Sequence, residues 1–328
     1  MEFIVINLFL TKDHIMQRTH THLFLFSVFI LNMITFHTAQ GKFSFKKVSS
    51  WFATQQNEEI LEKAYDIEEG KKLRVENIDG NITIKTDPNQ VTIALRAIKR
   101  TAQAEQLEAI TIVSEYNNNN LVLKTEYTAE IVGAQVDYEL SVPAQTKLHL
   151  ITQKGKITID EAYSPIVATT TQGDITVANT HDAVKLETKE TGAVHIAHAA
   201  GNVYATTTNG AIIIDKAYKN VVAQAEKGNI LLNCMEVPAK STIRLNTNAG
   251  TIQLALPTET NARLKGKTER GTLVSDHYIT LNEQTTQLNR KAWTRFKKEV
   301  NGMLGSGEAQ IEVHTANGNV KIKETKTA

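Results

Sequence analysis

Cysteine is almost absent from this chain of 328 residues, with Cys234 as its single representative. This scarcity excludes an intrachain disulfide and a zinc site of the Cys-x-x-Cys type, so we expect Cys234 to act as a small core hydrophobe. Only five prolines are present, and aromatic residues make up 6%. The net charge of +1 argues against a dedicated nucleic-acid binder, because such a protein carries a strongly basic face.

Long apolar segments are missing as well. The apolar run of residues 23–36 is shorter than the roughly 20 residues that a membrane-spanning helix needs. It follows the basic residue Arg18 and suits the core of a signal peptide. We therefore predict a signal peptide over residues 1–39, with Met16 as an alternative start, and a mature exported chain from about Gln40. An uncleaved segment that anchors the protein in a membrane is the other interpretation.

A repeat centred on glycine runs along most of the chain. In the copy at Gly173, small or aliphatic residues lie seven and five positions before the glycine and two and four after it. A threonine lies three positions before it, so the copy comprises Ile166, Ala168, Thr170, Ile175 and Val177. The copies are centred on Gly80, Gly155, Gly173, Gly192 (with one inserted residue), Gly210, Gly228, Gly250, Gly271 and Gly318.

The alternation within each copy predicts two short strands with one buried face. Its phase changes at the glycine, which predicts a structural corner there, where glycine supplies a positive φ or tolerates crowding. All five prolines lie outside the strand windows, as expected because proline cannot donate to a sheet ladder. On this basis Gly210→Val destabilises strongly, since a β-branched residue is costly at positive φ, whereas Lys227→Ala at an exposed corner is nearly neutral.

These patterns predict an all-β protein. From Gly155 to Gly271 the glycines are 18–22 residues apart, which suits one coil of a β-solenoid per repeat. A meander of bent hairpins is the alternative, because Asn-Gly at 209–210 and 317–318 is also a hairpin signal. We divide the mature chain into an N-terminal lead-in β-sheet and cap, the solenoid array, an irregular basic insert, and a terminal coil that closes the other end. Their boundaries are residues 40–145, 146–275, 276–309 and 310–328.

Four segments carry a family resemblance. They are LRVENIDGNITI, YELSVPAQTKLHLITQKGKITI, the coils with a threonine three residues before each glycine, and GSGEAQIEVHTANGNVKI. Together, over about residues 60–325, they resemble the bacterial "putative adhesin" family of β-strand-repeat domains, a domain family of unknown function. The resemblance implies an exported, solenoid-like, all-β domain at the cell envelope, and it supplies no catalytic residues.

Some solenoids are polysaccharide lyases or hydrolases, in which paired carboxylates would act as general acid and base. Asp160, Asp174, Asp182 and Asp215 lie at or near coil corners, and Asp174 has no acidic counterpart one coil away. We interpret all four as solvated corner residues. His195 and His198 are three residues apart on a strand and point to opposite faces, so they do not form a metal site. We predict no catalytic residues, no cofactor and no metal.

Two runs of threonine and one basic run are further candidates for binding elements. The runs Thr169–Thr171 and Thr206–Thr208 do not continue as outward ranks in other coils, which excludes an ice-binding face. The threonine three residues before each glycine is instead expected to point inward and satisfy a backbone group. The basic run of residues 289–298 is interpreted as a solvated segment, with a docking patch for acidic polymers or lipid headgroups as the alternative.

These observations favour an exported, non-enzymatic cell-envelope protein that binds a protein or glycan surface, as an adhesin does. Outward Asn, Gln, Lys and Glu side chains of the array would carry the recognition. We expect no nucleic-acid partner, membrane contact only through an uncleaved N-terminal segment, and a location in the periplasm, at the cell surface or outside the cell. The alternatives are an envelope-stress or structural module like the "toastrack" domains that similar repeats form, and a carbohydrate-active β-helix enzyme.

Overall fold

The computed structural model describes residues 57–118, 120–129, 131–281 and 298–325. The chain divides into two compact units, Met1–Thr54 and Gln55–Ala328, and every described residue belongs to the second. The predicted signal peptide and most of the basic run, at residues 1–39 and 289–298, lie outside the described residues. No helix in the described part is long and apolar enough to cross a bilayer.

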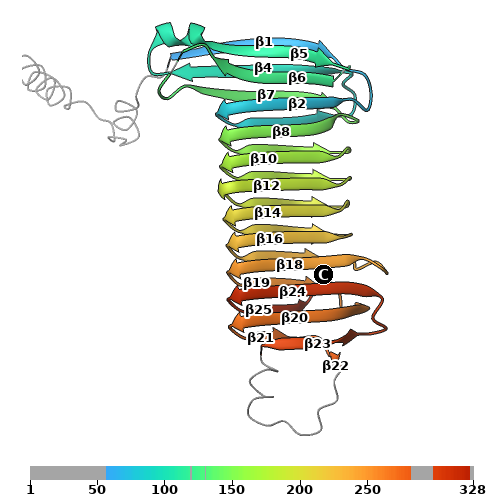
Figure 1. Ribbon diagram of the computed structural model, residues 1–328. Helices are drawn as coiled ribbons and strands as arrows, with labels where there is room; N and C mark the ends of the chain where they lie inside the picture. The colour runs from blue at the N-terminus through green and yellow to red at the C-terminus, as the bar shows by residue number, and fades with distance from the viewer. Residues whose placement is uncertain (1–56, 119, 130, 282–297, 326–328) are drawn as a thin grey trace, which may run out of the picture. The chain divides into compact units, whose positions relative to one another are not determined.

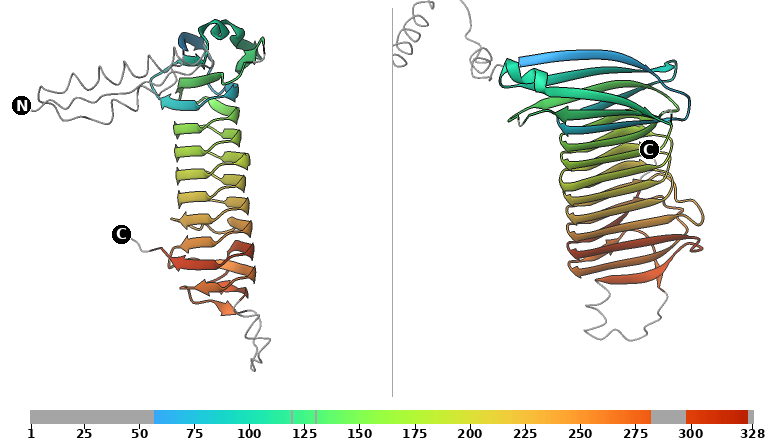
Figure 2. Two further views of the ribbon diagram at one scale, coloured as in Figure 1. Left: turned by 90° about the vertical axis from the view of Figure 1, so that its left-hand side faces the viewer. Right: turned by 45° about the horizontal axis from the view of Figure 1, so that its top comes forward.

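Two long β-sheets lie face to face and contain most of the described residues (Figures 1 and 2). In the described part of the chain, sheet A has 12 strands in the spatial order β1 (Asn57–Asp66), β4 (Thr92–Thr101), β7 (Gln135–Pro143), β3 (Ile82–Asp87), β9 (Ile157–Ala162), β11 (Ile175–Thr180), β13 (Val194–Ala199), β15 (Ile212–Ala217), β17 (Ile230–Cys234), β19 (Ile252–Leu256), β25 (Val320–Glu324) and β21 (Leu273–Ser275).

Sheet B has 13 strands within the described residues. Their spatial order is β22 (Thr280–Leu281), β23 (Glu299–Leu304), β20 (Ala262–Arg270), β24 (Ala309–Asn317), β18 (Thr242–Ala249), β16 (Val221–Lys227), β14 (Val203–Asn209), β12 (Val184–Thr191), β10 (Ile166–Gln172), β8 (Lys147–Lys154), β2 (Lys72–Asp79), β6 (Asn120–Tyr127) and β5 (Ile110–Asn117). A short 3-10 helix, η1 (Ala104–Ala109), connects β4 to β5.

Neighbouring coils pair in parallel and in register. β10 pairs with β8 on one side and with β12 on the other, and Ile166 lies opposite Val184 at the same position of the repeat. In a meander of hairpins, consecutive strands would instead pair antiparallel. The β-solenoid prediction is therefore confirmed, and the hairpin alternative is wrong.

The inward side chains of both sheets form one continuous hydrophobic core. Ile175 on β11 and Ile212 on β15 are both 0% exposed, as the alternation predicts. In sheet B, small residues such as Ala168 and Ala205 take inward positions and are also fully buried. Complete burial of one large aliphatic side chain contributes about 1.5–3 kcal/mol, so each coil gains its stability by stacking on its neighbours.

The threonine of the repeat points inward and hydrogen-bonds to the backbone of the preceding coil. Thr170 Oγ1 donates to the carbonyl oxygen of Gly155 at 3.1 Å, and Thr247 Oγ1 donates to that of Gly228 at 3.0 Å. Both threonines are 0% exposed. The expectation that this hydroxyl satisfies a backbone group is confirmed, and each bond links one coil to the preceding one.

The corner glycines form a column in which each backbone contacts the next. A Cβ added to Gly210 would lie 2.0 Å from the carbonyl oxygen of Gly192, and one added to Gly173 would lie 2.1 Å from that of Gly155. Gly173 has a φ of 146°, but Gly210 is not among the glycines with positive φ. Our φ-based reason for the sensitivity of Gly210 is thus wrong, and the close backbone approach replaces it. The same approach to a neighbouring backbone occurs at Gly80, Gly155, Gly192, Gly228, Gly250, Gly271 and Gly318.

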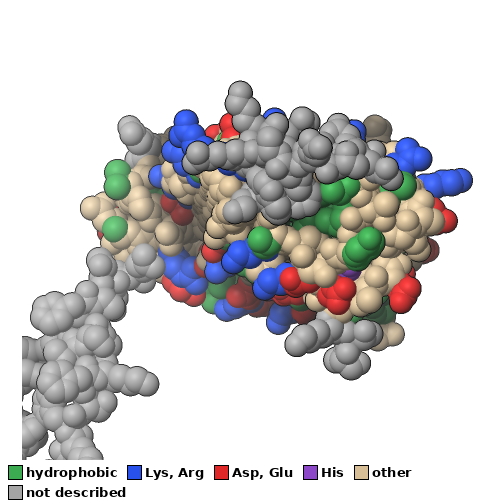
Figure 3. Space-filling view, turned by 90° about the horizontal axis from the view of Figure 1, so that it is seen from below, with side chains coloured by type: hydrophobic (Ala, Val, Ile, Leu, Met, Phe, Trp, Pro, Cys, Tyr) green, Lys and Arg blue, Asp and Glu red, His purple; other side chains and the backbone are tan. Residues whose placement is uncertain are grey.

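At the C-terminal end, the coils do not stack in the order of the sequence. β24 lies between β18 and β20, and β25 lies between β19 and β21 (Figure 1). The coil around Gly318 is therefore internal, and our expectation that it closes the end is wrong. The coil of β20 and β21 lies outside it. Its edge strand β21 spans only Leu273–Ser275, and the outer edge of β20 is covered by the antiparallel strand β23, so both sheets leave little backbone open to strand addition at this end. Viewed from this end, side chains of both charge signs surround the rim (Figure 3).

A similar exchange occurs at the N-terminal end. β2 and β3, the coil around Gly80, lie between the coil of β6 and β7 and the coil of β8 and β9. The lead-in strands therefore extend the two solenoid sheets instead of making a third sheet. β1, β4 and β5 pair antiparallel with their neighbours and cover the outermost coil. Exposed glutamates on β1, such as Glu58 and Glu62, discourage strand addition at this edge.

Candidate binding surface

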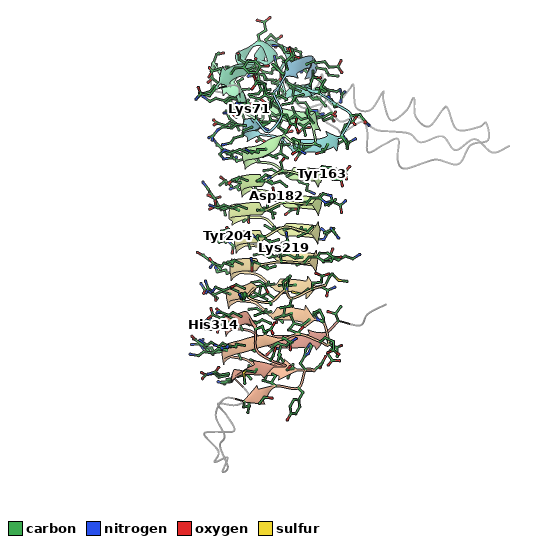
Figure 4. The ribbon with its side chains drawn as sticks, turned by 90° about the vertical axis from the view of Figure 1, so that its right-hand side faces the viewer. Lys71, Tyr163, Asp182, Tyr204, Lys219 and His314 are labelled. Atoms are coloured by element: carbon green, nitrogen blue, oxygen red, sulfur yellow. The ribbon has the colours of Figure 1, made fainter. Side chains whose placement is uncertain are left out.

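The outer face of sheet B carries a patch of polar side chains from β12 to β18. On β14, Tyr204 and Thr206 face outward, whereas Val203 and Ala205 are buried, because alternate side chains of a strand point to opposite sides. Figure 4 shows Tyr204 and His314 on the same side of the stack. We call this patch the polar face, and it comprises Lys185, Glu187, Lys189, Tyr204, Thr206, Thr208, Gln224, Glu226, Asn246 and Asn248.

Register places these side chains in rows across the strands. Thr206 lies opposite Gln224, and Gln224 lies opposite Asn246. Adjacent strands are about 4.8 Å apart, so a row of hydroxyl and amide groups crosses β14, β16 and β18. Asn246 Oδ1 is 3.1 Å from His314 Nδ1 on β24, which extends the row by one strand.

The polar face lines an open depression of about 470 Å³. Tyr204 borders it with 39% of its surface exposed. Lys185 Nζ lies 5.7 Å from the centroid of the Tyr204 ring, a cation–π contact of about 0.5–1 kcal/mol at an exposed site. Two lysines and two glutamates in the patch balance each other in formal charge. The depression is thus electrically balanced and rich in hydrogen-bonding groups.

The outer face of sheet A has a different chemistry. Ile213 and Leu231 lie opposite each other on β15 and β17, and Leu231 is 40% exposed. Small residues such as Ala197 and Ala255 occupy other outward positions of this face. An outward row of this face runs from Thr176 and His195 to Gln253, and Ile213 and Leu231 interrupt its polar groups. The hydroxyl and amide groups on β14, β16 and β18 of sheet B are instead contiguous.

A second hollow, of about 600 Å³, lies over β1, β4, β7 and β3. Arg96 is one of its lining residues, with Nη1 at 2.7 Å from Glu139 Oε2 and Nε at 3.6 Å from Glu62 Oε1. The hydrogen bond that Arg96 donates to Glu139 raises the pKa of Arg96 above its ordinary value. Because the Arg96 guanidinium is already paired with two carboxylates, this hollow offers a ligand fewer free hydrogen-bonding groups than the polar face does.

The four aspartates examined as catalytic candidates lie apart. Asp160 on β9 and Asp215 on β15 are three strands apart, or about 14 Å. Asp182 lies at the edge that faces the viewer in Figure 4, beyond the end of β11, and Asp174 follows the corner glycine at the start of β11. Asp174 Oδ1 accepts a hydrogen bond from Ala193 N at 2.9 Å. The structure therefore assembles no carboxylate pair from this set.

His195 and His198 have separate partners. His195 Nε2 is 2.7 Å from Asp215 Oδ2, whereas the His198 ring contacts that of Tyr218 with centroids 5.1 Å apart. Among the described residues, no group of three or more His, Cys, Asp or Glu side chains is arranged to hold a metal ion. Cys234 is 1% exposed, and burial raises the pKa of its thiol to about 12, so it packs as a small core side chain.

Two features escaped the sequence reasoning. The residue after the corner glycine caps the next coil: Asn229 Oδ1 accepts from Thr251 N at 2.8 Å, as Asp174 does for Ala193. The recurrence of Asn or Asp directly after these glycines was the available signal. Tyr204 was also missed as a surface residue, although it occupies an outward position where other coils carry valine, lysine or arginine.

The chain has measurable similarity to several known proteins. No curated protein matches it. A putative adhesin from Bacteroides fragilis is 12% identical, with 81% of this chain and 97% of that chain covered and a TM-score of 0.40. A putative adhesin from Parabacteroides distasonis has the same identity and coverages (12%, 81% and 97%) and a TM-score of 0.36. A putative cell adhesion protein from Clostridium sporogenes is 13% identical over 83% of this chain and 100% of that chain, with a TM-score of 0.25.

The family comparison bears on the C-terminal half of the solenoid. It identifies a stretch that begins on β13 and ends on β25. That stretch contains most of the polar face, from Tyr204 to Asn248. The resemblance to a repeat-domain family of unknown function is confirmed there, because residues 196–323 match the family model Toastrack DUF4097.

Proposed function

We propose that this protein is a non-enzymatic, exported cell-envelope protein that binds another surface through its polar face. The observation that carries the proposal is the in-register display of hydroxyl and amide groups over β14, β16 and β18. Each of these strands is hydrogen-bonded on both sides, so its outward side chains start from a fixed backbone. A binding surface with such preorganisation loses little conformational entropy when a partner docks.

The arrangement of acid and base groups favours binding over catalysis. The His195–Asp215 pair is exposed on sheet A, with 40% and 52% of the two side chains accessible. Among the described residues, no serine, threonine or cysteine hydrogen-bonds to His195, which a nucleophile activated by this pair would require. Export is supported by the predicted signal peptide at residues 1–39.

Adhesion of protein-coated beads tests this proposal. Beads that carry the exported domain, from about Gln40 onward, are applied to layers of whole bacteria and of host-cell matrix, and retention under flow is counted. We expect retention by the wild type and its loss in the triple variant Tyr204→Ala, Gln224→Ala, Asn246→Ala. The matched control Gln253→Ala alters an outward amide on sheet A and retains adhesion. Polysaccharide turnover that disappears on substitution of Asp160 or Asp215 would instead establish an enzyme.

A structural or envelope-sensing module is the second candidate, because the matching family model is the Toastrack one. The two candidates differ in what happens to the N-terminal segment. Sequencing the N-terminus of the native protein from separated cell fractions distinguishes them. A chain that begins near Gln40 and is recovered outside the membrane supports the adhesive function. A chain that keeps residues 23–36 and sediments with membranes supports the anchored module.

A further inference from the structure

We propose that the depression beside Tyr204 binds an uncharged polysaccharide chain that lies across β12, β14, β16 and β18. This inference rests on the proposed function, since it names the ligand class of the same polar face. The depression is lined by side chains of all four strands. Four adjacent strands span about 14 Å from first to last, so several sugar units of an extended chain can be contacted at once.

The hydrogen-bonding groups match those of a sugar. Gln224 and Asn246 each present an amide with two donor hydrogens and an acceptor oxygen, and Thr206 between β12 and β16 presents a hydroxyl. A sugar hydroxyl is also both donor and acceptor, so each of these groups can pair with it in either direction. The row is continuous, because its members are directly opposite one another on adjacent strands.

Tyr204 supplies the apolar contact that a sugar ring also needs. Tyr204 lines the depression and is 39% exposed, and a tyrosine offers an apolar ring together with a polar tip. The Lys185 ammonium, 5.7 Å from the ring centroid, favours a fixed ring orientation. The C–H groups on one side of a pyranose can pack on such a ring while its hydroxyls reach the amide row.

Charge and shape favour a neutral glycan over other ligands. Lys185 and Lys189 are offset by Glu187 and Glu226, so the patch has no net charge to attract a polyanion. The core of a protein–protein interface is enriched in aromatic and apolar side chains, whereas hydroxyl and amide groups dominate here. A small-molecule pocket buries most of its ligand, whereas this depression is open along its length.

Affinity electrophoresis tests the assignment. The folded domain is run in native gels that contain hydroxyethyl cellulose, yeast mannan, dextran or, as a polyanion, heparin. We expect at least one neutral polysaccharide to retard the wild type, and Tyr204→Ala to weaken that retardation by roughly tenfold. Gln224→Ala and Asn246→Ala weaken it as well. Tyr278→Ala, which removes an 89% exposed tyrosine outside the depression, and Gln253→Ala on sheet A leave it unchanged.

The outcomes separate this inference from the proposed function. Retardation only by heparin, abolished by salt, overturns the neutral-glycan assignment. If no polysaccharide retards the protein but beads still adhere and lose adhesion with Tyr204→Ala, the ligand is not a glycan and the proposed function stands. If neither retardation nor adhesion occurs, both fail. Unchanged melting temperatures of the variants verify that each loss arises from the surface and not from unfolding.

Discussion

Replacing Gly210 by alanine tests whether close approach between coils, and not glycine's backbone freedom, dictates the corner residue. The added Cβ would lie 2.0 Å from the carbonyl oxygen of Gly192, although the φ of Gly210 is not positive. Gly70 offers the opposite case, with a φ of 74° and no atom within 4 Å of an added Cβ. Alanine at Gly70 therefore incurs only the left-handed backbone penalty, about 1–2 kcal/mol.

The magnitude at Gly210 follows from the bonds that the methyl group would stretch. A normal contact requires the two coils to separate by about 1.5 Å at the corner. Two hydrogen bonds join them there, from Gly192 N to Asn209 O and from Val194 N to Ala211 O, each 2.9 Å long. Loss of each costs about 1–1.5 kcal/mol, so we expect Gly210→Ala to destabilise by about 3 kcal/mol once looser packing is added.

Urea unfolding followed by far-ultraviolet circular dichroism provides the comparison. The wild type, Gly210→Ala and Gly70→Ala are measured under the same conditions, and the slopes are compared because solenoids can unfold in parts. We expect the Gly210 variant to lose clearly more stability than the Gly70 variant. Equal losses, or a Gly210 variant within 1 kcal/mol of wild type, would refute the close-approach argument.

Three further predictions concern the corners and pH. Thr247→Ala removes the hydroxyl that links two coils and lowers the unfolding free energy in urea by about 1 kcal/mol. Asn229→Ala removes a cap on the next coil and lowers the unfolding free energy by a similar amount. The control Lys227→Ala, at an exposed position, changes it by no more than about 0.5 kcal/mol, and a larger loss in the Lys227 variant than in the Asn229 variant would contradict the capping role. Burial and the Arg74 charge lower the pKa of His149 below its ordinary 6.5, so the folded protein binds this proton less well than the unfolded chain does. The melting temperature should therefore fall as the pH drops below 6.5, and less steeply in His149→Gln; identical slopes would exclude the effect.

The repeat in the sequence was sufficient to predict the coils. Positions such as Ile175 and Ile212 alternate with polar residues, and that alternation directly reports which side of a strand is buried. The stacking order at the two ends was not predictable in this way. The coil around Gly318 carries the same pattern whether it lies at the end or inside the stack, because every coil presents equivalent edges to its neighbours.

The sequence predicted that outward polar residues form the candidate surface, but it did not predict which of them lie next to one another. The alternation assigns Gln224 and Asn246 to the outside, but it does not indicate that they are neighbours, because register between strands depends on loop lengths along the whole array. The role proposed for Tyr204 depends on its exposure and on the nearby Lys185, and both are properties of the folded surface. Asp160 and Asp215 both lie five residues after a corner glycine, but the two glycines are three coils apart, so the repeat itself indicates that these carboxylates do not form a pair.

The exchange of coil order near the C-terminus also affects how the molecule is made. A ribosome or export channel releases β20 and β21 before β24 and β25, their permanent neighbours in the finished stack. The coils therefore cannot stack strictly in the order in which they leave the ribosome or the export channel. A chain truncated after β21 would lack the coil of β24 and β25, and the backbone donors and acceptors of β18 and β19 that pair with it would be left unpaired. Such unpaired strand edges promote association between chains, so we expect truncated chains to aggregate instead of forming a shorter soluble solenoid.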